Sequence, residues 1–322
     1  MMVTLDDIRI AHSRLHGIAV RTPLIRCFTG DEGALYLKPE SFQPIGSFKL
    51  RGAYNKLATA PEADRNRGVI GYSSGNHAQG VAYAAREFGV KCVIVMPRNA
   101  PKGKIDATAA LGAEIVTVGP SSDERKKKAE ELAEQHGYMI VPPYNDEAII
   151  AGQGTVGLEI VTDLPDVDLV LCPVGGGGLI SGVATAVKLS GSRAKVIGVE
   201  PELANDAQQS YRSGQIVSIP AERAASTLAD GLRTQSIGPI NYEHIRKHVD
   251  DIITVSENEI RSAVKRMVTV AHIAPEPSGA VTFAAWLYHR TQLPEATKAV
   301  AVVSGGNIEP ELLAELLRNS SQ

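Results

Sequence analysis

Residues 167–179 are Val-Asp-Leu-Val-Leu-Cys-Pro-Val-Gly-Gly-Gly-Gly-Leu, an apolar run that ends in four consecutive glycines. The apolar run predicts a strand over 167–174 that is buried on both faces, and a helix is predicted from about Leu179. Strands of this kind, each followed by a helix, are typical of parallel sheets covered by helices on both sides. The expected fold class is therefore α/β. The glycines lie at the carboxyl end of a strand, where such sheets bind ligands.

The four glycines Gly175–Gly178 are a candidate phosphate site. Because glycine lets the backbone approach a ligand, several N–H groups can point at one anion, and the following helix adds the partial positive charge of its N-terminus. No Lys-Ser or Lys-Thr follows, as a P-loop requires, and the glycines do not fit the dinucleotide fingerprint. A plain tight turn is the alternative, but four glycines in an ordered junction cost conformational entropy, which favours the phosphate site.

The same alternation of strand and helix occurs along most of the chain. Strands are expected at 68–72, 91–96, 114–118, 139–141, 167–174, 194–199, 251–255 and 298–303, and a helix over 153–162. Residues 201–250 follow the pattern poorly and are expected to form loops and short helices. The strands fall into two groups, which predicts a large discontinuous domain of residues 1–49 and 146–322 and a small mobile domain of residues 50–145. A ligand is expected in the cleft between them.

The composition limits what the chain can bind. Its 322 residues carry a formal net charge of −3, so no broad basic field is expected to hold nucleic acid or an anionic membrane. No apolar run approaches the roughly 18 residues of a membrane span, and Met1–His12 lacks the apolar core of a signal peptide. Cys27, Cys92 and Cys172 lack metal-ligand spacing and fit a reducing compartment. We expect a soluble, cytoplasmic protein with a small-molecule ligand.

Two further strand ends carry small polar residues, and one lysine has an unusual context. Ser73-Ser74-Gly75-Asn76-His77 and Ser304-Gly305-Gly306-Asn307 follow the first and last predicted strands. Each fits a ligand-binding loop or an ordinary turn, and spacing alone does not separate the two. Lys49 lies between Phe48 and Leu50 in the stretch Gly-Ser-Phe-Lys-Leu-Arg-Gly-Ala. On its own, such a lysine is more often a surface residue than a catalyst.

In combination, these motifs resemble the fold-type II pyridoxal-phosphate enzymes, specifically the serine/threonine dehydratase and serine racemase group, whose fold is like that of tryptophan synthase β. The resemblance runs from Arg21-Thr22-Pro23-Leu24 to Ser304-Gly305-Gly306-Asn307. Gly-Ser-Phe-Lys-x-Arg-Gly-Ala, Ser-Ser-Gly-Asn-His, Ala-Gly-Gln-Gly-Thr, the four glycines and Ser-Gly-Gly-Asn occur in the family's order. One of these motifs alone is weak evidence, whereas five in order are highly specific.

The resemblance assigns a role to each matching residue. It implies that Lys49, next to Phe48, holds pyridoxal phosphate as a Schiff base and that Gly175–Gly178 bind its phosphate. The other implied roles concern the cofactor ring and the substrate: Asn76 hydrogen-bonds the ring hydroxyl, Ser304 faces the pyridine nitrogen, Glu276 lies close to the ring, Ser74 lies on the ring face opposite the lysine, Ser73, Ser74, Gly75, Asn76 and His77 together bind the substrate carboxylate, and Tyr144 occupies the place of an aromatic residue that dehydratases often carry.

These residue types fit the elimination of water from a β-hydroxy amino acid such as L-serine or L-threonine. The cofactor ring withdraws electrons from Cα, and a lysine takes the α-proton only if its surroundings lower its pKa. Loss of the β-hydroxyl then yields a 2-oxo acid and ammonia. A serine at the pyridine nitrogen, in place of an aspartate, is expected to leave that nitrogen unprotonated and to favour fast β-elimination.

The resemblance also implies a divalent-cation site. In Glu200-Pro201-Glu202-Leu203-Ala204-Asn205-Asp206, the carboxylates of Glu200 and Asp206 and the carbonyl of Ala204 match the family's ligands. Hard oxygen donors of this kind suit Mg²⁺ or Ca²⁺. Spacing alone, without the family context, favours a solvated acidic loop.

Three features distinguish this sequence from some of the proteins that it resembles. Ile45 stands where many relatives have threonine, which removes a hydroxyl near the lysine. Tyr144 stands where animal serine racemases tend to have asparagine, which favours elimination over racemisation. The chain continues for 15 residues beyond Asn307, so a regulatory domain like that of biosynthetic threonine dehydratases is not expected.

The activity itself has two rivals. One is a serine racemase that uses Lys49 and Ser74 on opposite ring faces, and the other is a catalytically inactive homologue that only binds a ligand. The substrate is open as well, since 3-hydroxyaspartate, phenylserine or a hydroxyectoine-derived compound can take the place of threonine. The family suggests a homodimer.

Overall fold

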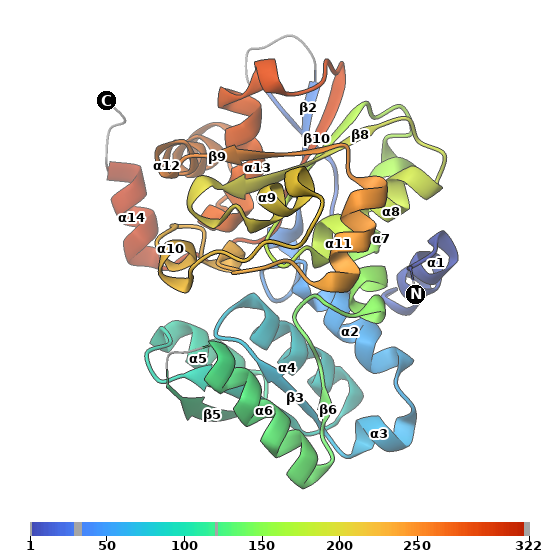
Figure 1. The fold of residues 1–322 in the computed structure, drawn as a ribbon, viewed down its shortest axis with the longest axis vertical. Coiled ribbons are helices and arrows are strands. Elements are labelled where there is room, and N and C mark those ends of the chain that lie inside the picture. The colour runs from blue at the N-terminus through green and yellow to red at the C-terminus, as the bar shows by residue number, and fades with distance from the viewer. Residues whose placement is uncertain (1, 29–33, 120–121, 319–322) are drawn as a thin grey trace.

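The computed structural model describes residues 2–28, 34–119 and 122–318, which fold into two α/β units (Figure 1). The larger unit contains a six-stranded sheet with the order β1-β2-β10-β7-β8-β9, and the smaller unit contains a four-stranded sheet with the order β5-β4-β3-β6. The expected α/β fold with two parallel sheets is confirmed, except that one edge strand of the larger sheet is antiparallel.

The strands of the larger sheet lie outside residues 50–145. They are β1 (Ile25–Cys27), β2 (Ala34–Pro39), β7 (Leu169–Pro173), β8 (Lys195–Pro201), β9 (Asp251–Val255) and β10 (Lys298–Val303). Among these strands β1 runs antiparallel to β2, and the other neighbouring pairs are parallel. β7, β8 and β10 are buried along nearly their whole length, because helices cover both faces of the sheet.

The strands of the smaller sheet lie within residues 50–145, and all their pairings are parallel. They are β3 (Val69–Tyr72), β4 (Cys92–Pro97), β5 (Glu114–Val118) and β6 (Met139–Ile140). The helices that connect them are α4 (Asn76–Phe88), α5 (Lys102–Ala110) and α6 (Ser122–His136). Their apolar faces and the strands form a core that is separate from the core of the larger unit.

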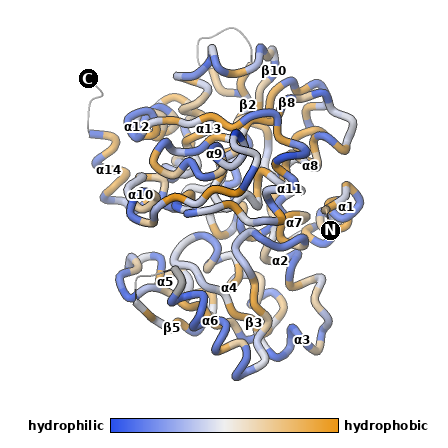
Figure 2. The backbone as a smooth tube through the Cα atoms, in the orientation of Figure 1, coloured by the Kyte–Doolittle hydropathy of each residue, from blue (hydrophilic) through white to orange (hydrophobic). Residues whose placement is uncertain are grey.

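Most of the remaining helices surround the larger sheet, whereas α2 (Lys49–Thr59) joins the two units and α3 (Glu62–Asn66) lies beside the smaller sheet (Figure 1). The others are α1 (Leu5–Arg14), α7 (Glu147–Asp163), α8 (Gly178–Leu189), α9 (Asp206–Ser213), α10 (Ala221–Ala225), the short 3-10 helix η3 (Asp230–Leu232), α11 (Pro239–His248), α12 (Glu257–Arg266), α13 (Pro277–Tyr288) and α14 (Pro310–Arg318). Figure 2 shows mostly hydrophobic residues along α13 and mostly hydrophilic residues along α6. None of the helices in the described residues is both long and apolar enough to span a membrane.

Glycines allow α7 to pack tightly against α2 and α8. A Cβ on Gly152 would lie 2.6 Å from the Arg51 carbonyl of α2, and a Cβ on Gly182 of α8 would lie 2.4 Å from the Gly154 nitrogen. The Gln153 side chain accepts a hydrogen bond from the N–H of Gly52 at 3.1 Å. The Ala-Gly-Gln-Gly-Thr motif therefore serves helix packing and holds the beginning of α2 in place.

Four buried charged side chains form a cluster beside the beginning of α2, to which Arg51 belongs. Arg51 contacts Glu40 at 2.7 Å and Glu159 at 2.7 Å, and Lys38 contacts Glu159 at 2.6 Å. All four side chains are at most 3% exposed. The two cations balance the two carboxylates, so each buried charge has a partner.

The helix expected over 153–162 begins earlier than predicted. α7 starts at Glu147, because the Asp146 carboxylate caps it by accepting hydrogen bonds from the N–H groups of Ala148 and Ile149 at 2.9 and 3.1 Å. Residues 147–152 are apolar around most of the helix, so they show no amphipathic period that a sequence pattern detects.

Candidate active site

The loop that precedes Lys49 pairs with the loop that follows β10. The N–H of Phe48 donates to the Ser304 carbonyl at 3.1 Å, and the N–H of Gly306 donates to the Gly46 carbonyl at 2.9 Å. Two motifs that lie more than 250 residues apart in the sequence are thus joined by backbone hydrogen bonds. This pairing forms one wall of the candidate site.

Lys49 is the first residue of α2, and its side chain is half-buried. Its Nζ donates to the Pro143 carbonyl at 2.9 Å and lies 5.2 Å from the centroid of the Phe48 ring. Burial lowers the pKa of Lys49 to about 8, against the opposing effect of the nearby Glu276. A buried amine with a lowered pKa has a larger neutral fraction at neutral pH, which is the form that acts as a nucleophile or a base.

Asn76 lies at the centre of the polar contacts. Its Nδ2 donates to Glu276 Oε1 at 2.7 Å, and its Oδ1 accepts from Asn307 Nδ2 at 2.8 Å. An asparagine side chain has two N–H groups and two acceptor positions, so half of its hydrogen-bonding capacity remains for a ligand. The surrounding protein therefore fixes the orientation of the Asn76 amide before any ligand arrives.

Glu276 is the N-cap residue of α13 and is 2% exposed. Burial is the main cause that raises the pKa of Glu276 to about 8, with a further contribution from Asp230. The carboxyl group is thus largely protonated at neutral pH. It can donate a hydrogen bond to a ligand, which an ionised carboxylate cannot do.

The four glycines form the turn from β7 into α8. Gly177 has a φ of 92°, and a Cβ there would lie 2.9 Å from the Cβ of Asn241. The ring of Tyr144 packs on the same turn, since a Cβ on Gly176 would lie 2.2 Å from its Cδ1. Because the first turn of a helix has N–H groups without helical partners, these residues present donors suited to an anion.

The loop between β3 and α4 contains the remaining predicted substrate residues. The Ser73 hydroxyl accepts from the Gly75 N–H at 3.2 Å, and Ser74 is half-buried on the same loop. His77 behaves differently from its neighbours, because its Nε2 bonds the Val141 carbonyl at 2.9 Å. Because the first turn of α4 has N–H groups without helical partners, the start of this helix offers donors for a carboxylate, whereas the Nε2 of His77 holds α4 to the chain after β6.

His77 gives the stability of the protein a dependence on pH. Burial, and then the charge of Lys49, lower the pKa of His77 from 6.5 to about 3. The unfolded chain therefore binds a proton below pH 6.5 that the folded chain does not bind, so stability is complete above this pH and decreases as the pH falls. We expect His77 to cost about 2 kcal/mol of unfolding free energy between pH 7.5 and pH 5.

Urea unfolding of the cofactor-free protein and its His77→Gln variant at both pH values measures this effect. The difference between the two proteins should shrink by that amount at pH 5. An equal difference at both pH values would show that His77 is protonated in the folded protein.

Ser304 and Tyr144 complete the set of predicted residues in this region. The Ser304 hydroxyl is buried and makes a long hydrogen bond of 3.3 Å to the Ser278 carbonyl. Burial raises the pKa of Tyr144 to about 12, so its hydroxyl remains protonated at neutral pH. The carbonyl of Tyr144 accepts from Asn241 Nδ2 at 3.3 Å, which ties the Tyr144 segment to α11.

The comparison with known proteins agrees with these motifs. Residues 17–305 match the family described as pyridoxal-phosphate dependent enzyme. The chain belongs to this family. The L-threonine ammonia-lyase of Thermotoga maritima is 44% identical to it, over 98% of this chain and 78% of that protein.

Two further comparisons give the same result. The catabolic L-threonine dehydratase of Escherichia coli K12 is 41% identical, over 98% of this chain and 96% of that protein. The structure of maize serine racemase has a TM-score of 0.93 and 35% identity, and the match covers 98% of this chain and 97% of that chain. The expected fold-type II architecture is thereby confirmed.

The residues present fit the cofactor of the pyridoxal-phosphate family. The glycine turn lets Tyr144 and Asn241 pack directly on its backbone, and it leads into the N-terminus of α8, whose N–H groups suit an anion. Lys49 supplies a primary amine with a lowered pKa. The two are connected by the segment 143–144, since Pro143 accepts from Lys49 and Tyr144 packs on Gly176. The glycine turn and the amine of Lys49 are therefore linked through one short segment of the chain.

The predicted metal residues lie together at the end of β8. The Glu200 carboxylate accepts from the N–H groups of Ala207 and Gln208 at 3.1 and 2.7 Å. The Oδ2 atom of Asp206 is buried without a hydrogen-bond partner among the described residues. Burial raises the pKa of Asp206 to about 7, and burial together with Asp206 raises the pKa of Glu200. No group of three or more His, Cys, Asp and Glu suited to a metal occurs in the described chain, so a cation here needs carbonyl ligands as well.

The sequence patterns did not reveal several polar contacts of the site. They are the Pro143 carbonyl, the Asn307 side chain that bonds Asn76, the buried charge cluster, and the ion pair between Lys104 and Asp230. Asn307 belongs to the Ser-Gly-Gly-Asn motif, so the sequence marked it as a candidate. Its contact with Asn76 was not predictable, because the two residues lie far apart along the chain. A local sequence pattern does not show which lysine forms an ion pair with which aspartate.

Proposed function

We propose that the chain is a pyridoxal-phosphate-dependent ammonia-lyase that converts L-threonine and L-serine to a 2-oxo acid and ammonia. The observation that carries the proposal is the partly buried amine of Lys49, whose pKa is lowered to about 8 and which the segment 143–144 links to the glycine turn. The names of the two threonine-deaminating relatives, at 44% and 41% identity, support this substrate class.

Each residue of the site then has a defined task. The bound cofactor supplies an electron-withdrawing ring at the substrate Cα. Lys49, next to Phe48, carries the cofactor and removes the α-proton, and the N–H groups of Gly175–Gly178 hold its phosphate. The residues around the ring and substrate are Asn76 at the ring hydroxyl, Ser304 at the pyridine nitrogen, Glu276 beside the ring, Ser74 on the face opposite Lys49, Tyr144 beside the substrate, and the backbone of Ser73, Ser74, Gly75, Asn76 and His77 at the substrate carboxylate.

A substrate screen tests the proposal. The purified holoenzyme is incubated with L-threonine, L-serine, 3-hydroxyaspartate, phenylserine and a hydroxyectoine-derived hydroxy amino acid, and ammonia and 2-oxo acid are measured. Release from L-threonine or L-serine is expected. A protein that binds the cofactor and deaminates none of these compounds would refute the ammonia-lyase proposal.

Serine racemisation is the second candidate, because the match to maize serine racemase covers nearly the whole chain. Incubation with L-serine separates the two, since elimination gives pyruvate and racemisation gives D-serine. Tyr144, which packs on the glycine turn, favours elimination under our proposal. More D-serine than pyruvate would favour racemisation over elimination as the main activity.

The glycine turn gives a prediction for cofactor affinity. Gly177→Ala places a methyl group 2.9 Å from the Cβ of Asn241 and forces alanine into a φ of 92°. We expect the apparent Kd for pyridoxal phosphate to rise at least about tenfold, which corresponds to ~1.4 kcal/mol. Gly191→Ala is the control, because Gly191 has a φ of 79° with no neighbouring atom within 4 Å. Equal losses of affinity in both variants would show that backbone strain, and not the position of Gly177 in the glycine turn, is responsible.

We also propose that Glu200, Asp206 and the Ala204 carbonyl bind Mg²⁺ or Ca²⁺. Support comes from the buried Asp206 oxygen that has no partner among the described residues, and from the raised pKa of both carboxyls. A cation at 100 times its Kd should stabilise the fold by about 2.7 kcal/mol. Thermal unfolding with and without the ion should show this increase, and Asp206→Asn should remove it while the exposed Asp106→Asn does not. No shift with either ion would argue for a carboxylate pair that shares a proton.

Three coarser features complete the proposal. We propose a homodimer, supported by the exposed rings of Phe28 and Phe42, and light scattering measures its mass. We propose a cytoplasmic location, supported by three buried free cysteines. We propose that residues 1–49 and 146–322 form the large domain and residues 50–145 the small mobile domain, supported by the separate sheets and cores.

A further inference from the structure

The loop that contains Asp230 is fixed to the larger unit. The carboxylate of Glu257, at the start of α12, accepts a hydrogen bond from the Thr227 hydroxyl at 2.5 Å. The N–H of Gly231 donates to the hydroxyl of Ser278 on α13 at 2.9 Å. Asp230, the first residue of η3, is therefore held in a defined position near the N-terminal end of α13.

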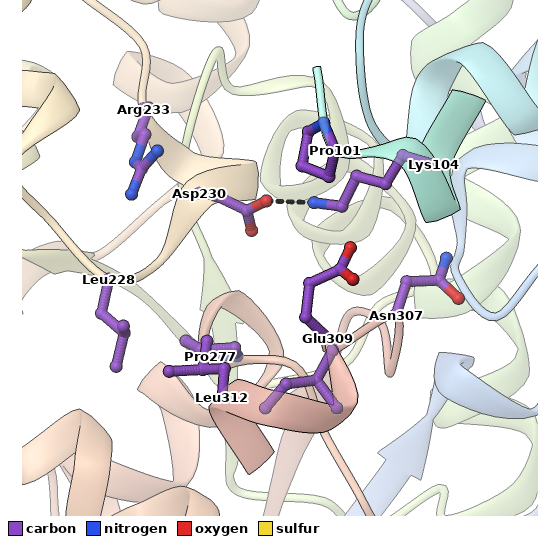
Figure 3. A pocket seen from close by; sticks show the side chains of 10 residues that line it. Pro101, Lys104, Leu228, Asp230, Arg233, Pro277, Asn307, Glu309 and Leu312 are labelled. Carbon is purple, nitrogen blue, oxygen red and sulfur yellow. Dashed lines mark hydrogen bonds and ion pairs between the residues drawn. The ribbon is translucent and has the colours of Figure 1, made fainter. Parts of the chain in front are cut away.

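Lys104 reaches this loop from the smaller unit. Its ammonium group, on α5, forms an ion pair with Asp230 beside a cavity of about 170 Å³, and Figure 3 shows the two side chains pointing toward one another. The side chain of Lys104 is 12% exposed. Lys102, two residues earlier on α5, is 86% exposed and pairs with Asp106 of its own helix. The Asp230 side chain is 35% exposed, so this pair is partly buried and water screens it less than the pair of Lys102 with Asp106.

The ion pair lies next to the buried carboxyl of Glu276. A Cβ on Gly231 would be 3.8 Å from Glu276 Oε1, so η3 lies directly against this group. The charged and polar groups that face Glu276 are Asp230 from η3, Lys104 from α5, Lys49 from α2, the Asn76 amide from α4 and the N–H of Asn307. The negative charge of Asp230 and the positive charge of Lys104 therefore act on Glu276 in opposite directions.

We propose that the ion pair between Lys104 and Asp230 sets the charge state of Glu276, and through Glu276 that of the Lys49 amine, whenever the two units are in contact. Both residues are positioning residues, because they act through Glu276 and not at the reacting atoms. The inference rests on the proposed function, in which Lys49 must be neutral to accept the α-proton. Under this proposal, contact between the two units changes the protonation of Glu276 and Lys49.

Opposite effects of the two partners follow from their charges. Loss of the Lys104 charge leaves Asp230 facing Glu276 alone, which favours the protonated carboxyl and raises its pKa. Loss of the Asp230 charge leaves Lys104, which favours the carboxylate and lowers the pKa. A purely structural role predicts something else, since removal of either partner breaks the same contact and both variants should then behave alike.

The experiment is a pH titration of the visible absorption band of the bound cofactor, in the holoenzyme without substrate. The band reports the protonation of the nitrogen that Lys49 supplies, and a negative charge on Glu276 favours its cationic form. Lys104→Gln should therefore move the midpoint downward and Asp230→Asn should move it upward, each by roughly half a pH unit or more. Lys104→Arg keeps the charge and should restore the wild-type midpoint. Lys102→Gln is the matched control on the same helix and should leave the midpoint unchanged. The same two substitutions in a Glu276→Gln background should no longer move it in opposite directions.

The possible outcomes are distinct. Opposite shifts that disappear in the Glu276→Gln background support the proposal. Shifts in the same direction, no shifts, or opposite shifts that persist without Glu276 overturn it. If Lys104→Gln does not fold, an unchanged midpoint in Lys104→Arg and a raised midpoint in Asp230→Asn still separate a charge effect from a structural one. The band is recorded without substrate, so a failure to deaminate any hydroxy amino acid would count against the proposed function and leave this test intact.

Discussion

Replacement of Lys49 by alanine is expected to lower kcat/KM for deamination by at least about a thousandfold, or ~4 kcal/mol of transition-state stabilisation. The alanine removes both the amine that carries the cofactor and the base that takes the α-proton. The Nζ of Lys49 is held at 2.9 Å from the Pro143 carbonyl, a position that the shorter side chain cannot reach. Activity is measured as 2-oxo acid formation, and covalent attachment of the cofactor as visible absorbance that borohydride removes.

Lys102→Ala is the control for the Lys49 variant, because Lys102 is 86% exposed on α5. It should retain the activity and the visible band of the wild type. Deamination by Lys49→Ala at the wild-type rate for every hydroxy amino acid would refute the proposed function. A colourless wild-type protein after incubation with the cofactor would do the same and would favour an inactive homologue.

Arg51→Met is expected to destabilise the fold by about 3–5 kcal/mol. The substitution leaves Lys38 as the remaining cation in the cluster for the buried carboxylates of Glu40 and Glu159, which lose their contacts with Arg51 at 2.7 Å each. A buried charge without a partner costs far more than an exposed one. Urea unfolding of the cofactor-free protein gives the difference in unfolding free energy.

Arg67→Met is the matched control, since Arg67 forms an ion pair with Asp64 at the surface and is 53% exposed. We expect a change of less than about 1 kcal/mol for this exposed pair. The acidic partners also respond to Arg51, because its charge lowers the pKa of Glu40 against the effect of burial. Similar losses in the two variants would show that water enters the cluster and screens its charges.

The regular elements were predictable because strand and helix periods are local properties. The strands expected at 114–118, 251–255 and 298–303 coincide with β5, β9 and β10, and the other predicted strands differ from the observed ones by a few residues at their ends. The strands β1 and β2 were not anticipated, and the three residues of β1 are too few to show a period. The helix α7 began earlier than expected, because its first turns are mostly buried and show no polar face.

The residues of the candidate site that belong to sequence motifs could be predicted. Contacts between charged residues that lie far apart in the sequence could not. Ser304 and Phe48 belong to motifs that are recognisable in the sequence, but the backbone contact between them was not predicted. The contact of Lys104 with Asp230 joins residues 126 positions apart. In the sequence Lys102 and Lys104 are alike in charge and context, and only the three-dimensional packing distinguishes them.

The backbone pairing of residues 46–48 with residues 304–306 has a consequence during biosynthesis. A nascent chain contains Lys49 early but cannot complete the wall beside it until β10 has been translated. Every ribosome-bound intermediate before that point lacks Ser304 and the carbonyl that holds Phe48. Capture of the cofactor should therefore wait until residues 304–306 have emerged from the ribosome, and fragments truncated before residue 304 should remain colourless even when their smaller sheet is folded.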